Sequence, residues 1–159
     1  MLLIVWHSRT GTARALAEAA YEGARGEGAA RLVTAEDAGA EDVLAARGFL
    51  FVCPENLGSM SGEMKAFFDR TYYAALGRID GRAYGTMIAA GSDGQGAQRQ
   101  LDRIVTGWRL RRVVEPVIVN TAAQTPAEIL APKIVPPEVL QKCRELGQGF
   151  SAALLLGVF

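Results

Sequence analysis

The chain has 159 residues, of which 50% are hydrophobic and 21% are charged. This composition is typical of a globular protein with its own core, and the length fits one domain, so we expect residues 1–159 to form a single domain. Seventeen basic residues balance 17 acidic ones. The zero net charge argues against a nucleic-acid partner, because that affinity rests on a basic surface.

The cysteines and the two ends of the chain carry further expectations. Cys53 and Cys143 are too few and too far apart for a metal cluster or a disulfide framework, so we expect two buried thiols. The first residues form an apolar run without the basic region of a signal peptide, which favours the cytoplasm. The apolar tail GFSAALLLGVF has about half the roughly 20 residues of a membrane span. We expect it to continue a packed helix or to meet a second subunit in a homo-oligomer.

Short β-rich runs alternate with longer stretches of helical period. This alternation predicts an α/β fold in which helices connect parallel strands. Several of the runs are continuously apolar, as expected for strands that helices cover on both faces. The five expected strands are residues 2–6, 30–34, 49–53, 84–90 and 113–120.

The helical stretches show apolar side chains on one face. Residues 16–24 and 64–72 repeat apolar positions with the period of a helix that packs on a sheet, and the aromatic stripe of the second is expected in the core. A further helix is expected over 97–108, and the last starts at the proline pair 136–137. Residues 36–46 predict a short helix.

The turn after the first strand combines hydroxyl groups, a glycine and a helix start. Ser8, Arg9, Thr10, Gly11 and Thr12 present backbone N–H groups, hydroxyls and the positive end of a helix dipole to one point. Such a point suits an anion, most often a phosphate. The alternative is a capped helix and a tight turn without a ligand.

Three glycine-rich loops follow predicted strands. They are HSRTGTA, PENLGSMSG and GSDGQGA, after the first, third and fourth strands. With the strand order 2-1-3-4-5 these loops lie side by side at the carboxyl edge of the sheet, where doubly wound proteins bind ligands. Each loop alone is also compatible with a simple chain reversal. Neither a dinucleotide fingerprint nor a GxxxxGK[ST] motif is present, which disfavours nucleoside triphosphate chemistry.

The order of the three loops resembles the flavodoxin-like superfamily of FMN-binding proteins. The segment PENLGSMSGEMKAFFDRT is similar to the P-x-x-x-G-x-M-x-G-x-M motif of the NAD(P)H-dependent FMN reductases and the quinone oxidoreductases of the Trp-repressor-binding-protein type. Pro54, Gly58, Met60, Gly62 and Met64 fall in register with that motif. The resemblance implies a three-layer sandwich with a five-stranded parallel sheet of order 2-1-3-4-5.

The resemblance also implies an FMN site. The first loop would wrap the phosphate, and the two later loops would flank the isoalloxazine ring. The implied phosphate residues are Ser8, Arg9, Thr10, Gly11, Thr12 and Ala13, where Ala13 replaces a frequent hydroxyl residue. The implied ring residues are Pro54, Glu55, Asn56, Leu57, Gly58 and Ser59 on one side, and Gly91, Ser92, Asp93 and Gly94 on the other.

The function implied is an oxidoreductase that takes hydride from NAD(P)H and passes electrons to a small acceptor, a quinone or a flavin. One alternative is a flavodoxin-type electron carrier, although such carriers are usually acidic and stack aromatic rings on the flavin, which these loops do not offer. A second is a domain that binds a ligand or partner without redox turnover. The only histidine, His7, is either a proton donor or a hydrogen-bonded structural residue. Flavin chemistry needs no acid or base from the protein, so no catalytic residue is expected.

Overall fold

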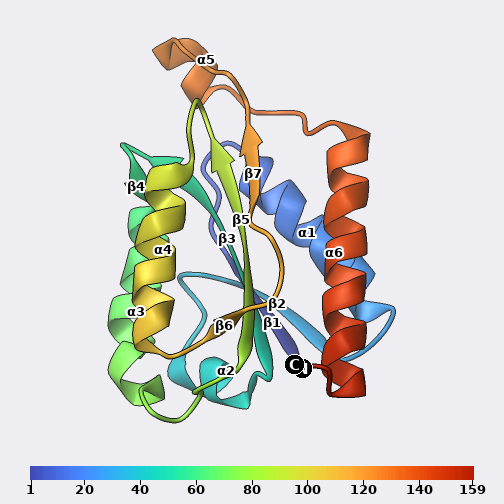
Figure 1. Ribbon diagram of the computed structural model, residues 1–159. Coiled ribbons are helices and arrows are strands. Elements are labelled where there is room, and N and C mark those ends of the chain that lie inside the picture. The colour runs from blue at the N-terminus through green and yellow to red at the C-terminus, as the bar shows by residue number, and fades with distance from the viewer.

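The computed structural model describes all residues, 1–159, as a parallel sheet between two layers of helices (Figure 1). Helices α1 and α6 cover one face of the sheet, and α3 and α4 cover the other. The strands are β1 (Leu2–Trp6), β2 (Ala30–Thr34), β3 (Gly48–Asn56), β4 (Ser59–Met60), β5 (Ala83–Ala90), β6 (Arg111–Arg112) and β7 (Val117–Asn120). The helices are α1 (Thr12–Arg25), α2 (Ala40–Ala45), α3 (Gly62–Ala75), α4 (Gln95–Gly107), α5 (Pro126–Leu130) and α6 (Pro137–Leu156).

The sheet has the strand order that the sequence predicts, with one change at its outer edge. Strands β2, β1, β3 and β5 lie in that order and pair in parallel. Both β6 and β7 pair with β5, so the expected fifth strand, 113–120, is replaced by two short strands. Residues 113–116 lie outside both strands; Val113 still donates its N–H to the Tyr84 carbonyl, but Pro116 has no N–H to donate.

Three other elements differ from those expected. Strand β3 continues past residue 53 to Asn56, because Glu55 and Asn56 pair with the additional antiparallel strand β4. Helix α2 is shorter than 36–46, since the Asp42 carboxylate accepts the Gly39 N–H and so caps the helix there. Helix α5 lies in a connection for which no helix is expected.

Two cores fill the space on either side of the sheet. Between the sheet and helices α3 and α4, Phe49, Phe51, Phe67, Phe68 and Trp108 are fully buried and pack with ring centroids 5.1–6.5 Å apart. The aromatic stripe of α3 is therefore core, as predicted. The other core lies under α1 and α6.

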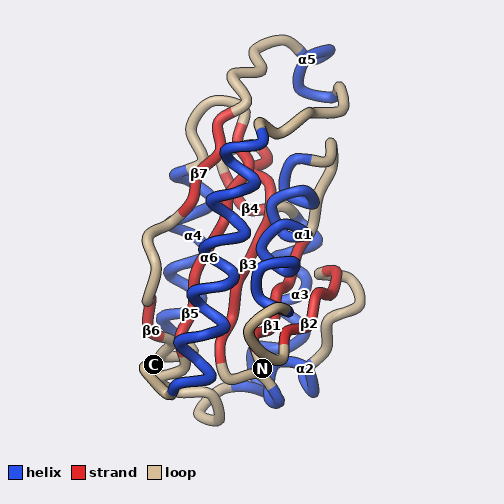
Figure 2. The backbone as a smooth tube through the Cα atoms, turned by 90° about the vertical axis from the view of Figure 1, so that its right-hand side faces the viewer, coloured by secondary structure: helices blue, strands red, loops and turns tan.

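Helices α1 and α6 approach each other closely enough to bring their backbones together (Figure 2). A Cβ atom on Gly147 would lie 2.0 Å from the Ala20 carbonyl oxygen, and one on Gly23 would lie 2.0 Å from that of Arg144. Only glycine fits at these two positions. Because α6 reaches Leu156, the apolar tail does continue a packed helix.

Both cysteine thiols are buried and free, as the sequence predicts. None of the helices combines the length and the apolar character that a membrane crossing requires.

Candidate functional site

A cleft opens at the carboxyl ends of the strands. It contains about 570 Å³ of empty space, which includes the solvent at its open mouth. The first loop, the end of β3, the end of β5 and the segment before α6 form its walls. The lining residues are Ser8, Arg9, Thr10, Thr12, Ala13, Pro54, Glu55, Asn56, Ala89, Ala90, Gly91, Thr121, Ala123, Ile129, Leu130 and Lys133.

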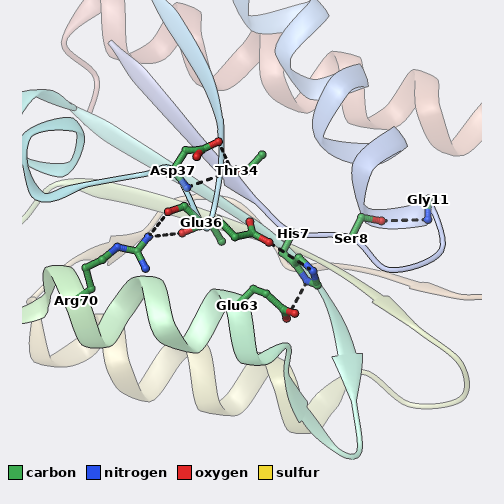
Figure 3. A network of polar contacts seen from close by, with 9 residues as sticks. His7, Ser8, Gly11, Thr34, Glu36, Asp37, Glu63 and Arg70 are labelled. Atoms are coloured by element: carbon green, nitrogen blue, oxygen red, sulfur yellow. Dashed lines mark hydrogen bonds and ion pairs between the residues drawn. The ribbon is translucent and has the colours of Figure 1, made fainter.

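The first loop leaves a helix N-terminus open toward this cleft. Gly11 adopts a left-handed conformation (φ 98°), and its N–H donates to the Ser8 hydroxyl at 3.1 Å (Figure 3). Helix α1 then begins at Thr12 without a side-chain cap, so its first N–H groups have no partner within the helix. The Thr12 hydroxyl is buried and also has no hydrogen-bond partner. Together these groups form a set of donors without an acceptor.

The segment after β3 is a β-hairpin rather than a loop. Glu55 pairs with Met60, and Leu57 and Gly58 form the tip with positive φ angles of 50° and 74°. The Leu57 side chain is fully exposed. The Ser59 hydroxyl donates to the Asn56 carbonyl at 3.2 Å and so closes the turn.

The hairpin is fastened to the start of helix α4. The Glu55 carboxylate accepts the N–H groups of Gly94 and Ala97, both at 2.9 Å. A Cβ atom on Gly96 would lie 2.0 Å from the Gly58 carbonyl oxygen, so helix and hairpin tip are in backbone contact. The two loops expected to flank a ring are therefore held as one rigid unit.

The two helices that start beside the cleft differ in their electrostatics. The N-terminus of a helix carries partial positive charge, which a carboxylate neutralises. Glu55 fills this position at α4, while no acidic residue lies in the first turn of α1. The N-terminus of α1 is therefore the one of these two helix termini that is available to bind an anion in the cleft.

The loop after β5 is fixed by residues of β7 and of the segment that follows it. The Asn120 side-chain amide donates to the Ser92 carbonyl. A Cβ atom on Gly91 would lie 3.4 Å from the Ala123 carbonyl oxygen. Gly94 has a φ of 87°, and a Cβ atom there would lie 2.6 Å from the Ile118 side chain. A larger residue at Gly94 would therefore be strained in its backbone and would clash.

His7 does not belong to the cleft lining. It is buried between two acidic side chains, with Nδ1 3.5 Å from Glu63 and Nε2 4.0 Å from Glu36 (Figure 3). Arg70 holds the neighbouring turn by donating to the Ala35, Glu36 and Ala38 carbonyls. The buried Nδ1 has no hydrogen-bond partner, so the choice between a proton donor and a hydrogen-bonded structural residue stays a prediction.

Cys53 precedes the cleft residue Pro54 but is itself fully buried. Burial raises the pKa of its thiol to about 12. The group is therefore a neutral thiol at neutral pH.

The structure brings most of the predicted site residues to the one cleft. Ser8, Arg9, Thr10, Thr12, Ala13, Pro54, Glu55, Asn56 and Gly91 line it directly. Gly11, Leu57, Gly58, Ser59, Ser92, Asp93 and Gly94 lie in the same turns without lining it. Gly94 is further tied down because its N–H is bound by Glu55.

Sequence reasoning missed the part of the lining that follows β7. Thr121, Ala123, Ile129, Leu130 and Lys133 belong to this wall. Two signals were available. The fifth strand ends at the same edge of the sheet as the others, and the sequence Thr125-Pro-x-Glu128 is a capping box with proline in the first turn.

Comparison with known proteins places the chain in a family. Residues 35–124 match the family model of NADPH-dependent FMN reductases. A curated flavodoxin of Aquifex aeolicus is 36% identical over 107 residues, a match that covers 66% of this chain and 58% of that protein. The chain thus matches little more than half the length of this relative.

Solved structures share the fold at low identity. A flavodoxin from the domain Archaea superposes with a TM-score of 0.78 at 16% identity, covering 97% of this chain and 98% of its own. A WrbA-like flavodoxin from Agrobacterium tumefaciens gives a TM-score of 0.74 at 18% identity, with coverage of 98% and 97%. These likenesses establish a flavodoxin-like fold, and with the family match they show that the chain belongs to the NADPH-dependent FMN reductase family.

Proposed function

We propose that the cleft binds FMN with its phosphate at the start of helix α1. The observation that carries this proposal is the contrast between the two helix termini, α4 filled by Glu55 and α1 unfilled. The buried, unpartnered Thr12 hydroxyl supplies a further donor. A phosphate dianion would accept hydrogen bonds from all of these groups.

The isoalloxazine ring would lie between the β3–β4 hairpin and the residues 91–94. Both walls are pre-formed, because Glu55 and the contact of Gly96 with Gly58 fix one against the other. A pre-formed site loses little conformational entropy when its ligand binds.

The activity we propose is an oxidoreductase that takes hydride from NADPH or NADH and passes electrons to a small acceptor, a quinone or a flavin. The bound flavin supplies the redox chemistry, and the chain supplies position and electrostatics. The exposed Arg9 at the cleft mouth would attract the phosphates of the nicotinamide nucleotide. Support for this donor comes from the family match. We also propose that the protein forms a homo-oligomer and is located in the cytoplasm.

The second candidate is an electron carrier that a separate reductase reduces. The 36% identity to a protein named flavodoxin favours it. Zero net charge and the absence of aromatic residues from both ring-flanking loops oppose it, because carriers use strong surface charge to steer encounter with their partners.

Anaerobic mixing of the FMN-loaded protein with excess NADPH or NADH separates the two candidates. For the enzyme, the flavin absorption band bleaches without any added protein, and the rate depends weakly on ionic strength. If the flavin stays oxidised for many minutes and is reduced at once when a flavodoxin reductase is added, the protein is the carrier. If the protein does not bind FMN, both candidates fail.

A further inference from the structure

A strap of residues 121–135 crosses the open end of the sheet between β7 and α6, and it contains α5 (Figure 1, top). Both of its ends are tied to the walls of the cleft. The Thr121 N–H donates to the Ala90 carbonyl at 2.8 Å, and the Lys133 N–H donates to the Thr10 carbonyl at 3.0 Å. The strap thus spans the cleft from the ring side to the phosphate side.

Polar contacts within the strap, rather than a core, hold α5 in shape. None of its five residues is buried. The Glu128 carboxylate accepts the N–H groups of Gln124 and Thr125, both at 2.9 Å, at the start of the helix. At its end the Lys133 ammonium donates to the Ala131 carbonyl at 2.6 Å. The helix is therefore a small rigid body without packing beneath it.

Two large apolar side chains of this helix face the cleft. Ile129 is 49% exposed and Leu130 is 71% exposed, and both line the same cavity as Ser8 and Thr10. Apolar surface in water is unfavourable, and about half of Ile129 and most of Leu130 stay uncovered by the rest of the chain. The match to the family model ends at residue 124, so α5 lies outside the matched residues.

We propose that the strap is the cover of the bound FMN, with Ile129 and Leu130 packed on the cofactor. This inference rests on the proposed function. FMN is the expected ligand beneath the strap, because the Lys133 N–H is bound to the Thr10 carbonyl, in the turn that would hold the phosphate. FMN bound there lies beneath the strap and buries the two side chains, and the closed strap slows cofactor release.

A matched pair of variants tests the cover. Leu130→Ser and Leu155→Ser change the same residue type at similar exposure, 71% and 68%, but Leu155 lies at the end of α6, outside the cleft. Leu130→Ser should weaken FMN binding about tenfold, measured by quenching of flavin fluorescence, mainly through faster dissociation. Leu155→Ser should bind like the unmodified protein. Ile129→Ser provides a second variant if Leu130→Ser folds poorly.

Hydrogen exchange of the unmodified protein gives a readout independent of any variant. The N–H groups of Ile129 and Ala131 bond to the Thr125 and Ala127 carbonyls within the strap. FMN should slow their exchange severalfold. The cover is wrong, and the FMN site stands, if FMN binds tightly but leaves this exchange unchanged and if Leu130→Ser binds FMN as tightly as Leu155→Ser. If the unmodified protein does not bind FMN, both proposals are wrong.

Discussion

Oxygen Oε1 of Glu55 lies 2.9 Å from the backbone nitrogen of Gly94. This hydrogen bond and the one from the Ala97 N–H join the end of strand β3 to the start of helix α4, and thus the two sides of the expected ring site. The geometry of the site depends on Glu55 in addition to the residues that would contact the ring.

Glu55→Gln should loosen this connection. The amide oxygen can accept one N–H, but its NH2 group would face the other, and the charge at the helix terminus is lost. We expect a loss of about 1–2 kcal/mol in stability and faster amide exchange at Gly94 and Ala97. Glu138→Gln, in the first turn of α6 and not among the residues that line the cleft, is the control. Equal effects of the two changes would contradict the role of Glu55.

Thr12→Val should have opposite effects on the empty and the loaded protein. The Thr12 hydroxyl is buried without a partner, so its removal should leave the melting temperature of the apoprotein unchanged or raise it. FMN should bind more weakly by roughly 1–3 kcal/mol, because the valine offers no donor to the phosphate. Riboflavin, which has no phosphate, should bind as before. Calorimetric titration with both ligands measures the difference, and equal weakening would place the phosphate elsewhere.

Much of the cleft was predictable because its signals are local. The turn Ser8–Thr12 carries its own chemistry between a strand and a helix, and the carboxyl-edge rule brings it together with Pro54 and Gly91. The order of the first four expected strands is the one that the family resemblance implies. Patterns within a few residues therefore determine most of the fold and of the cleft.

The parts that were not predictable depend on contacts between distant residues. Glu55 caps helix α4 through Gly94, which lies 39 residues later, and no local pattern at Gly94 shows the missing cap. The strap acquires its place from the bond between Lys133 and Thr10, which lie far apart in the sequence. Such contacts exist only after the sheet has set the geometry.

Two glycines of helix α6 should respond to alanine in opposite directions. Gly147→Ala would place a Cβ atom 2.0 Å from the Ala20 carbonyl oxygen, whereas nothing lies within 4 Å of the Cβ position at Gly149. We expect Gly147→Ala to cost several kcal/mol, because α6 must move away from α1. Gly149→Ala should stabilise by about 0.5–1 kcal/mol through helix propensity. Urea unfolding of both variants would reveal the contrast, and similar midpoints would contradict it.

Because its two thiols are buried, we expect the protein to lose stability in alkali. Burial raises the pKa of Cys53 to about 12 and that of Cys143 to about 11, from an ordinary value of 9.0. The two thiols contribute fully to the free energy of unfolding below pH 9. This contribution is lost as the pH rises toward the pKa values of the folded protein, because the thiols of the unfolded chain release their protons first. Unfolding midpoints between pH 8 and 11 measure the effect. A thiol reagent should label neither cysteine in the native protein at pH 8, and both in denaturant.

The strap should weaken in acid. The N–H groups of Thr125 and Gln124 hold the pKa of the Glu128 carboxyl below its ordinary value of 4.5. The hydrogen bonds of Glu128 at the start of α5 are therefore intact above pH 4.5. They are lost as the pH falls through the lower pKa that the carboxyl has in the folded protein. The protection of the Gln124 and Thr125 amides, measured against their intrinsic exchange rates at each pH, should fall in that range. Glu128→Gln should remove this change in protection, while Glu138→Gln should preserve it.

The interruption at residues 113–116 also determines what the open edge of the sheet offers to other molecules. A continuous outer strand would present a regular row of unpaired N–H and C=O groups, onto which a strand of another chain can add. Here the outer position holds only β6, with the exposed charges of Arg111 and Arg112, and the four-residue β7, separated by a segment that contains Pro116. This edge is therefore a poor template for the addition of a strand from another molecule.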